Sequence, residues 1–136
     1  MGLIRSLSRS PLDATKPTGT AILVDPDEFL LAERYAVLRR TTEVVHAVST
    51  PSMLYELQSH EEPVVAIFSS EIGTFQLSAV TEYARHRWPH ARILIVGEAF
   101  RYLEDHLYDE TVSSSASAAE ILSAVEKCRG SRYLNN

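Results

Sequence analysis

Apolar runs and amphipathic segments alternate along this chain, and the alternation predicts a repeating strand–helix unit. Short apolar runs at 21–24, 44–48, 63–68 and 92–97, with a weaker one at 108–113, predict five strands. Each run precedes a segment with helical periodicity, at 29–40, 51–57, 73–88, 100–107 and 117–128. Strands that alternate with helices predict an α/β fold, a doubly wound five-stranded parallel sheet with helices on both faces and right-handed crossovers.

Several helix ends and apolar faces can be assigned from local chemistry. Thr50 followed by Pro51 predicts an N-cap and a first helical residue, and Ser117 with Glu120 has the spacing of a capping box. The spacing of apolar residues predicts which side chains face the core. They are Phe29, Leu30, Leu31, Tyr35 and Leu38 in the first helix, Met53, Leu54 and Leu57 in the second, Leu77, Val80 and Ala84 in the third, Phe100, Leu103 and Leu107 in the fourth, and Ile121, Leu122, Val125 and Cys128 in the last.

The stretch AILVDPDEFL at 21–30 is the centre of the pattern. It leads from a strand buried on both faces directly into Asp25, Pro26 and Asp27. Open α/β sheets place their sites at the carboxyl ends of strands, so any site in this chain is expected to start at these acids. Two interpretations stay open: the carboxylates cap the first helix, or they bind a cation.

Composition and charge narrow the functional classes. The chain has 136 residues, 45% of them apolar and 23% charged, and a formal net charge of −5, which is typical of one globular domain. The acidic balance argues against nucleic-acid binding, and the single cysteine excludes a disulfide framework. We expect a cytoplasmic protein that has no role at a membrane, since neither a spanning segment nor a signal peptide is visible.

The first residues differ from the rest of the chain. Residues 1–19 hold Arg5, Arg9 and Lys16 against one acid, so their charge is +2 while the remainder carries −7. We expect a flexible leader there, a domain at 20–130 and a frayed tail at 131–136. The start Met1-Gly2 with Ser6 also matches the N-myristoylation pattern, although such a short pattern is weak grounds for an anchor.

Four segments together resemble the receiver domain of bacterial two-component response regulators. They are ILVDPDEFL, PVVAIFSS, WPHARILIVG and SSSASAAEIL, and the resemblance covers about residues 20–130. It implies the strand order 2-1-3-4-5 of the receiver and flavodoxin-like folds. It also implies a phosphorylation site: paired acids for Mg²⁺ after the first strand, an acceptor aspartate after the third, a hydroxyl after the fourth and a lysine after the fifth.

This chain departs from that pattern at most of the chemical positions. Asp25 keeps the first acid, but the second, the main metal ligand, falls on Pro26, and Asp27 comes one residue late. The acceptor falls on Ser69, with Glu71 as the nearest substitute. The hydroxyl position falls on Gly97 and the lysine position on Ser114. Lysines occur only at 16 and 127, so no shift of one or two residues restores the ammonium. We expect no cofactor, and Asp25 and Asp27 are only weak candidates for a magnesium site.

The resemblance and these departures together favour a degenerate receiver, or pseudo-receiver. We expect a phosphorylation-independent module, not an enzyme, that binds a protein partner or a second copy of itself in bacterial signal transduction. The partner face implied by the family lies around the fourth helix, fifth strand and fifth helix. On this side we expect Phe100, Arg101, Tyr102, Glu104, Asp105 and Tyr108.

Other interpretations remain. One is a receiver with a rebuilt, phosphorylatable magnesium site. Another is a haloacid-dehalogenase-like phosphatase that uses Asp25 and Asp27, with Ser69 and Lys127 in supporting roles, although the Gly-Thr usual after the second acid is Glu28-Phe29 here. A flavin binder is disfavoured because no phosphate-binding loop follows the first strand. His86 and His90 have metal-ligand spacing on a helix, but Pro89 between them favours two solvated side chains.

Overall fold

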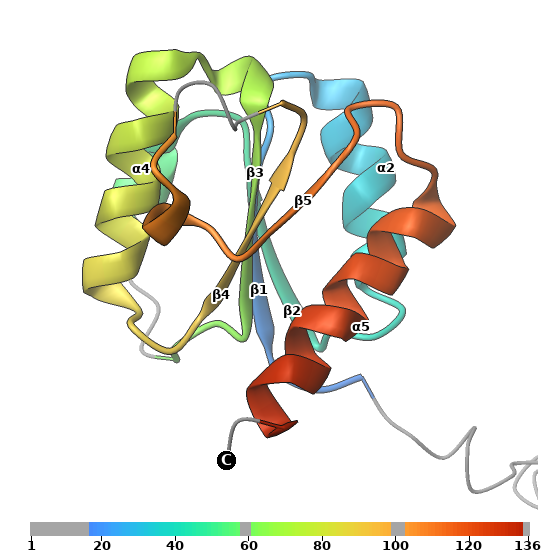
Figure 1. Ribbon diagram of the computed structural model, residues 1–136. Helices are drawn as coiled ribbons and strands as arrows, with labels where there is room; N and C mark the ends of the chain where they lie inside the picture. The colour runs from blue at the N-terminus through green and yellow to red at the C-terminus, as the bar shows by residue number, and fades with distance from the viewer. Residues whose placement is uncertain (1–16, 58–60, 99–102, 135–136) are drawn as a thin grey trace, which may run out of the picture.

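The structure, a computed structural model, describes residues 17–57, 61–98 and 103–134. Its centre is a sheet of five parallel strands in the order β2-β1-β3-β4-β5 (Figure 1). The strands are β1 (Thr20–Val24), β2 (Val44–Val48), β3 (Val65–Ser69), β4 (Arg92–Val96) and β5 (Glu110–Val112). The doubly wound fold predicted from the sequence pattern and the strand order implied by the resemblance are both confirmed.

Helices cover both faces of the sheet. They are α2 (Glu28–Leu38), α3 (Pro51–Tyr55), α4 (Thr74–Arg87) and α5 (Ala118–Leu134), with 3-10 turns η1 (Ser70–Ile72) and η2 (Asp105–Leu107). Helices α3 and α4 lie on one face, whereas α2 and α5 lie on the other (Figure 1). No helix in the described part of the chain is long and apolar enough to cross a membrane.

The apolar runs explain why β1 and β3 are central. Every residue of both strands is buried. Successive side chains alternate between the faces, so Ile22 packs toward α3 and α4 while Leu23 packs toward α2 and α5. A strand with apolar residues at every position can therefore be covered on both sides, which is the arrangement that the parallel sheet requires.

Local capping chemistry fixes several helix starts. The Thr50 side chain accepts a hydrogen bond from the Met53 amide, and Pro51 begins α3. The capping box before α5 is formed in both directions: the Glu120 amide donates to Ser117 Oγ at 3.2 Å, and the Ser117 amide donates to Glu120 Oε1 at 2.9 Å. Both predictions are confirmed, because each depends on residues within one turn.

The apolar face of α2 differs from the prediction. Phe29 is 77% exposed and Tyr35 36% exposed, whereas Arg34 and Leu38 are buried. The helix is rotated so that Leu31, Arg34 and Leu38 face the sheet. Met53 of α3 is also exposed, contrary to expectation, because this short helix has only one buried side, with Leu54 on it.

The described part of the connection from β4 to β5 contains less helix than expected. The 100–107 segment was predicted to be helical, but its described part contains only η2 at Asp105–Leu107. Phe100, Arg101 and Tyr102 lie outside the described residues, as does the leader up to residue 16. At the other end of the domain, α5 extends to Leu134, so residues 131–134 of the expected tail are helical.

Parallel pairing brings the carboxyl ends of the strands to one edge of the sheet. Val24 pairs with Phe68, Ser69 with Val96, and Val96 with Val112. The residues that follow β1, β3, β4 and β5 therefore meet at this carboxyl edge, the upper edge in Figure 1. Asp25, Ser69, Gly97 and Ser114 all lie there.

Candidate functional site

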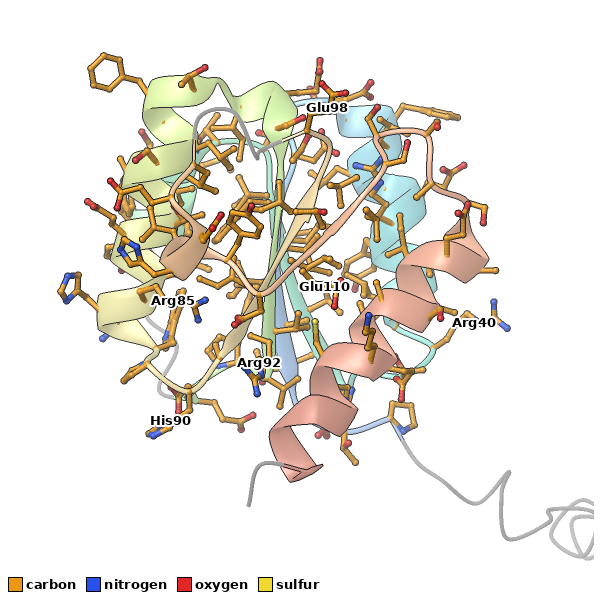
Figure 2. All side chains as sticks on the ribbon, in the orientation of Figure 1. Arg40, Arg85, His90, Arg92, Glu98 and Glu110 are labelled. Carbon is orange, nitrogen blue, oxygen red and sulfur yellow. The ribbon has the colours of Figure 1, made fainter. Side chains whose placement is uncertain are left out.

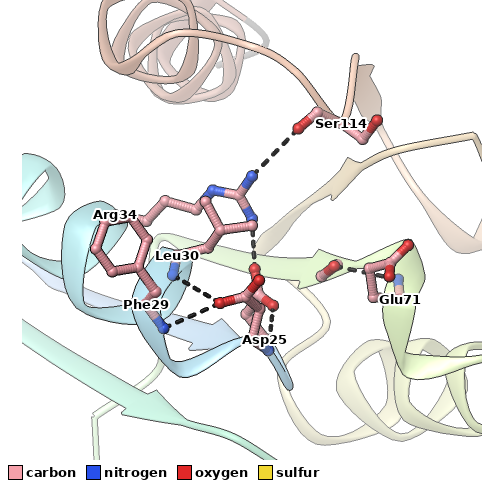
Figure 3. Close-up of polar contacts among 8 residues, drawn as sticks. Asp25, Phe29, Leu30, Arg34, Glu71 and Ser114 are labelled. Atoms are coloured by element: carbon pink, nitrogen blue, oxygen red, sulfur yellow. Dashed lines mark hydrogen bonds and ion pairs between the residues drawn. The ribbon is translucent and has the colours of Figure 1, made fainter.

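Asp25 is the innermost polar residue of the carboxyl edge. It follows β1 directly, and its amide donates to the Val48 carbonyl at 3.1 Å, which continues the pairing of β1 with β2. The residue is fully buried. Its Oδ1 atom accepts a hydrogen bond from the Asp27 amide at 2.9 Å (Figure 3). The carboxylate therefore closes the turn between β1 and α2.

Arg34 reaches back from α2 to the same carboxylate. Its Nη1 atom forms an ion pair with Asp25 Oδ2, and its Nη2 atom donates to the Ser114 carbonyl at 3.5 Å (Figure 3). The Arg34 residue is only 5% exposed. The guanidinium thus joins the end of β1 to the loop after β5 and supplies a positive charge inside the edge.

Arg34 is a site residue that the sequence pattern did not predict. One signal for it was present: Arg34 follows Leu31 by three residues and precedes Leu38 by four, so it lies on the buried stripe of α2. A charged residue on such a stripe needs a buried partner. Asp25, nine residues earlier, is that partner, but only the crossing of β1 and α2 brings the two together.

Opposing effects act on the pKa of Asp25. Burial raises the pKa, while the hydrogen bond from the Asp27 amide and the Arg34 charge lower it, and the balance stays above the ordinary value of 3.8. The residue pairs with a guanidinium that stays charged at all ordinary pH values. The Asp25 carboxylate and the Arg34 guanidinium, which have opposite charges, are therefore buried together with little contact with water.

Asp27 is the N-cap of α2. Its Oδ1 atom accepts hydrogen bonds from the amides of Phe29 at 3.0 Å and Leu30 at 3.1 Å (Figure 3). Pro26, between the two acids, is exposed. Asp27 therefore caps the first helix, as one of the two interpretations of the sequence predicts. Asp25 instead forms an ion pair with Arg34.

Ser69 ends β3 at the position expected for the phosphoacceptor. It is 4% exposed, and its Oγ atom accepts from the Glu71 amide at 3.1 Å (Figure 3). Ser69 is thereby the N-cap of η1. Glu71, the substitute acceptor suggested by the sequence, has an exposed side chain. In this arrangement the Ser69 hydroxyl stabilises a turn, and no base contacts it in the described part of the chain.

Gly97 stands where the receiver pattern has a hydroxyl residue. Its φ of 124° is a value that side-chain-bearing residues rarely adopt, and a Cβ atom there would lie 1.9 Å from Ser70 Oγ. The side chain of Ser70 therefore fills the space that a serine or threonine at position 97 would need. A glycine is the residue that both the backbone and the packing allow.

These residues do not suit a magnesium ion. Mg²⁺ needs carboxylate oxygens in octahedral arrangement and keeps several waters. Here Asp25 is paired with Arg34, Pro26 has no ligand atom, and one oxygen of Asp27 caps α2. Within 17–57, 61–98 and 103–134, no group of three or more histidine, cysteine or acidic residues is placed to hold a metal.

The remaining candidates lie away from this edge. Lys127 pairs with Glu110 at 3.3 Å, ten residues into α5 and about 15 Å from its start, so it does not serve Asp25 and Asp27 as a phosphatase lysine would. His90 Nδ1 pairs with Glu62 at 3.4 Å, beyond the end of α4.

On the expected partner face, Glu104 and Asp105 are exposed and Tyr108 is half-buried. Phe100, Arg101 and Tyr102 of that face are outside the described residues.

The comparisons with known proteins identify the fold. A receiver domain from Methanospirillum hungatei covers 87% of this chain and 98% of its own length, with a TM-score of 0.71 and 14% identity. A signal receiver domain of an HD domain-containing protein from Pseudomonas fluorescens covers 90% and 93%, with a TM-score of 0.72 and 12% identity. An adenylate cyclase structure from Rhodopirellula baltica covers 86% and 91%, with a TM-score of 0.73 and 18% identity.

The fold class follows from these likenesses. The fold is that of response-regulator receiver domains, which confirms the resemblance found in the sequence at the level of the fold. Comparisons of the sequence itself found nothing similar: no family model matches it, and no curated protein does.

Proposed function

We propose that this chain is a pseudo-receiver: a receiver-fold module of bacterial signal transduction that does not accept a phosphoryl group and acts by binding protein. The observation that supports it best is the Arg34–Asp25 pair. The Asp25 carboxylate, which would help to hold a metal, is already paired with the guanidinium of Arg34 from the same chain.

The other steps of phosphoryl transfer lack their groups as well. An acceptor carboxylate is missing at Ser69, whose hydroxyl caps η1 and has no base beside it among the described residues. The space for a hydroxyl at Gly97 is filled by Ser70. Where an ammonium would neutralise the phosphoryl oxygens, Ser114 contributes a carbonyl to Arg34. At these three positions, the groups that phosphoryl transfer requires are therefore absent.

A fold that has kept its frame without this chemistry works through its surface. We expect the partner to be a cytoplasmic protein or a second copy of this chain, and not a nucleic acid or a membrane. The acidic balance of the domain supports the exclusion of nucleic acid, since phosphate contacts need a basic stripe.

Intact-protein mass after incubation with a small-molecule phosphodonor, with and without Mg²⁺, tests the proposal. An active receiver treated in parallel shows that the donor is competent. We expect no adduct on this chain. A Mg²⁺-dependent phosphoryl adduct would instead establish a rebuilt site, and the variants Asp27→Asn and Glu71→Gln would show which carboxylate carries it.

The same preparation distinguishes the phosphatase interpretation. Hydrolysis of a generic phosphomonoester that requires Mg²⁺ and disappears in Asp25→Asn and Asp27→Asn would support an enzyme. We expect no hydrolysis above that of a preparation lacking the protein, because the Asp25 carboxylate is buried against Arg34.

A further inference from the structure

Two phenylalanines at the carboxyl edge have almost no protein cover. Phe29 is 77% exposed and Phe75 91% exposed. Phe29 is in the first turn of α2 and Phe75 in the first turn of α4, on opposite faces of the sheet, so the pair flanks the edge where β1 and β3 end (Figure 1). Aromatic side chains are enriched at protein interfaces, so these two residues make the edge a candidate contact surface.

The surface between the two phenylalanines carries acidic side chains. Asp27, Glu28, Glu71 and Glu98 are exposed there, and Glu98 is labelled at this edge in Figure 2. In the described part of the chain, the only lysine or arginine directed at this edge is Arg34, whose charge is taken up by Asp25. We call Phe29, Phe75 and these four acids the acidic–aromatic edge. Its complement is a segment that carries positive charge and apolar side chains.

The chain contains such a segment at its own N-terminus. Residues 1–9 read MGLIRSLSR, with apolar Leu3, Ile4 and Leu7 beside Arg5 and Arg9. The leader has a charge of +2, while the rest of the chain carries −7. The signs therefore favour contact between the leader and the acidic–aromatic edge, and attachment to the same chain keeps the effective concentration high.

The connection is long enough. Thr18 is held at the opposite, amino edge, where its amide donates to the Thr41 carbonyl at 3.2 Å and its hydroxyl accepts from Arg129 at 2.7 Å. From Thr18 to Val24, the last residue of β1, the chain covers at most about 20 Å to the carboxyl edge. Residues 10–17 can span about 26 Å when extended. Residues 1–9, which are about 30 Å long when extended, can then lie along the edge.

We propose that the leader docks on the acidic–aromatic edge of its own chain, with its apolar side chains against Phe29 and Phe75 and its arginines over the acids. Attraction between exposed charges contributes to this contact, and salt screens such attraction. The equilibrium constant for docking therefore falls as salt is raised toward 1 M, where the Debye length is about 3 Å. The proposal does not depend on whether the chain accepts phosphate.

A spin label on the leader tests this in the full chain. Ser6→Cys can be labelled selectively, because the natural Cys128 is buried and its thiol has a pKa raised to about 11. We expect a nitroxide at position 6 to broaden the amide signals of Phe29 and Phe75 in ¹⁵N-labelled protein. Broadening confined to residues near Thr18 and Thr41 would overturn the proposal.

Charge and surface variants sharpen the experiment. In Arg5→Glu/Arg9→Glu, the equilibrium constant for docking should fall about tenfold, because two surface charge pairs change sign. The exposed arginines 40 and 87, both changed to glutamate, make the same change in net charge on the body of the domain and should leave the broadening in place. Phe29→Ser/Phe75→Ser should abolish the broadening of the amide signals at positions 29 and 75. Equal broadening in all variants would refute a specific contact.

A mixed sample separates docking within one chain from docking between copies. Spin-labelled chain without ¹⁵N is mixed with ¹⁵N-labelled chain that has no spin label. We expect no broadening of Phe29 or Phe75 in this mixture. Broadening there would mean that the leader binds a second copy, which would overturn the intramolecular assignment. The dispersion of the amide spectrum shows in each case that the variant is folded.

Discussion

Replacing Arg34 by methionine removes the cation that contacts Asp25 while keeping a long side chain on the buried face of α2. The Asp25 carboxylate is then fully buried with only the Asp27 amide to stabilise its charge. Removing one partner of a buried ion pair typically costs about 3–5 kcal/mol. We expect Arg34→Met to lower the free energy of unfolding at pH 7 by this amount, a large share of the stability of a small domain.

The double variant isolates the pair itself. In Asp25→Asn/Arg34→Met neither residue is charged, and the asparagine oxygen still accepts from the Asp27 amide. Its cost should stay near 1–2 kcal/mol, because no uncompensated charge remains, while the ion pair and the bond to the Ser114 carbonyl are lost together. Asp25→Asn alone leaves the buried Arg34 without its counter-charge, so we expect the two single variants together to cost more than the double variant, which is the sign of a favourable coupling between the two residues.

The pH dependence provides an independent check. The native pKa of Asp25 lies above 3.8, so the native state binds more protons than the unfolded state between 3.8 and that native value. Ionisation of Asp25 therefore lowers stability as the pH rises through this window. Arg34→Met removes one influence that lowers the pKa and extends the window upward. The loss caused by Arg34→Met should thus shrink as the pH falls toward 4.

Urea unfolding followed by Trp88 fluorescence measures all four proteins. Trp88 is the single tryptophan of the chain and is 5% exposed, packed edge-on against Tyr83, so its emission should report on the core. A loss below about 1 kcal/mol for Arg34→Met, with an unchanged dependence on urea, would refute the reasoning. It would mean that water or another group compensates Asp25.

Three further predictions use the same unfolding assay or simple thiol chemistry. Gly97→Ala should cost about 2 kcal/mol or more, because the new Cβ meets Ser70 at a φ of 124°, and Ser70→Gly in the same chain should restore only the steric part; a neutral Gly97→Ala would contradict this packing. Thr42→Val should stabilise the protein by about 1 kcal/mol, since the Thr42 hydroxyl is buried without a partner in the described part of the chain, and a loss of stability would reveal an unseen hydrogen bond. The Cys128 thiol, whose pKa burial raises to about 11, should react with a disulfide reagent at pH 7.5 only after unfolding in urea, and fast reaction of the native protein would disprove its burial.

Much of the fold follows from patterns that span only a few residues. The all-apolar runs of β1 and β3, the N-cap at Thr50 with Pro51 and the Ser117 capping box each act within one strand or one helical turn. Their physical causes are burial and local hydrogen bonding, so the sequence alone predicts them. The resemblance to receivers also assigns Ser69 and Ser114 to the acceptor and lysine positions. The absence of an aspartate and a lysine there depends only on residue type, so the sequence alone predicts it.

The contents of the site depended on contacts between distant segments. Ser70 occupies the space beside Gly97, 27 residues later in the chain, because β3 and β4 are neighbours in the sheet. Nothing in the local sequence around either residue indicates this contact. The exposure of Phe29 likewise depends on how α2 is rotated against the sheet, and its periodicity had placed it in the core.

Arg34 shows the division between the two levels. Sequence determined that an acid follows β1 and that an arginine lies three residues after Leu31 and four before Leu38. Tertiary structure decided that these two residues meet, because only the packing of α2 on the sheet encloses both charges in one place and makes pairing favourable over hydration. Charge pairing in a buried site is a property of the assembled layers, and residue spacing along the chain does not encode it.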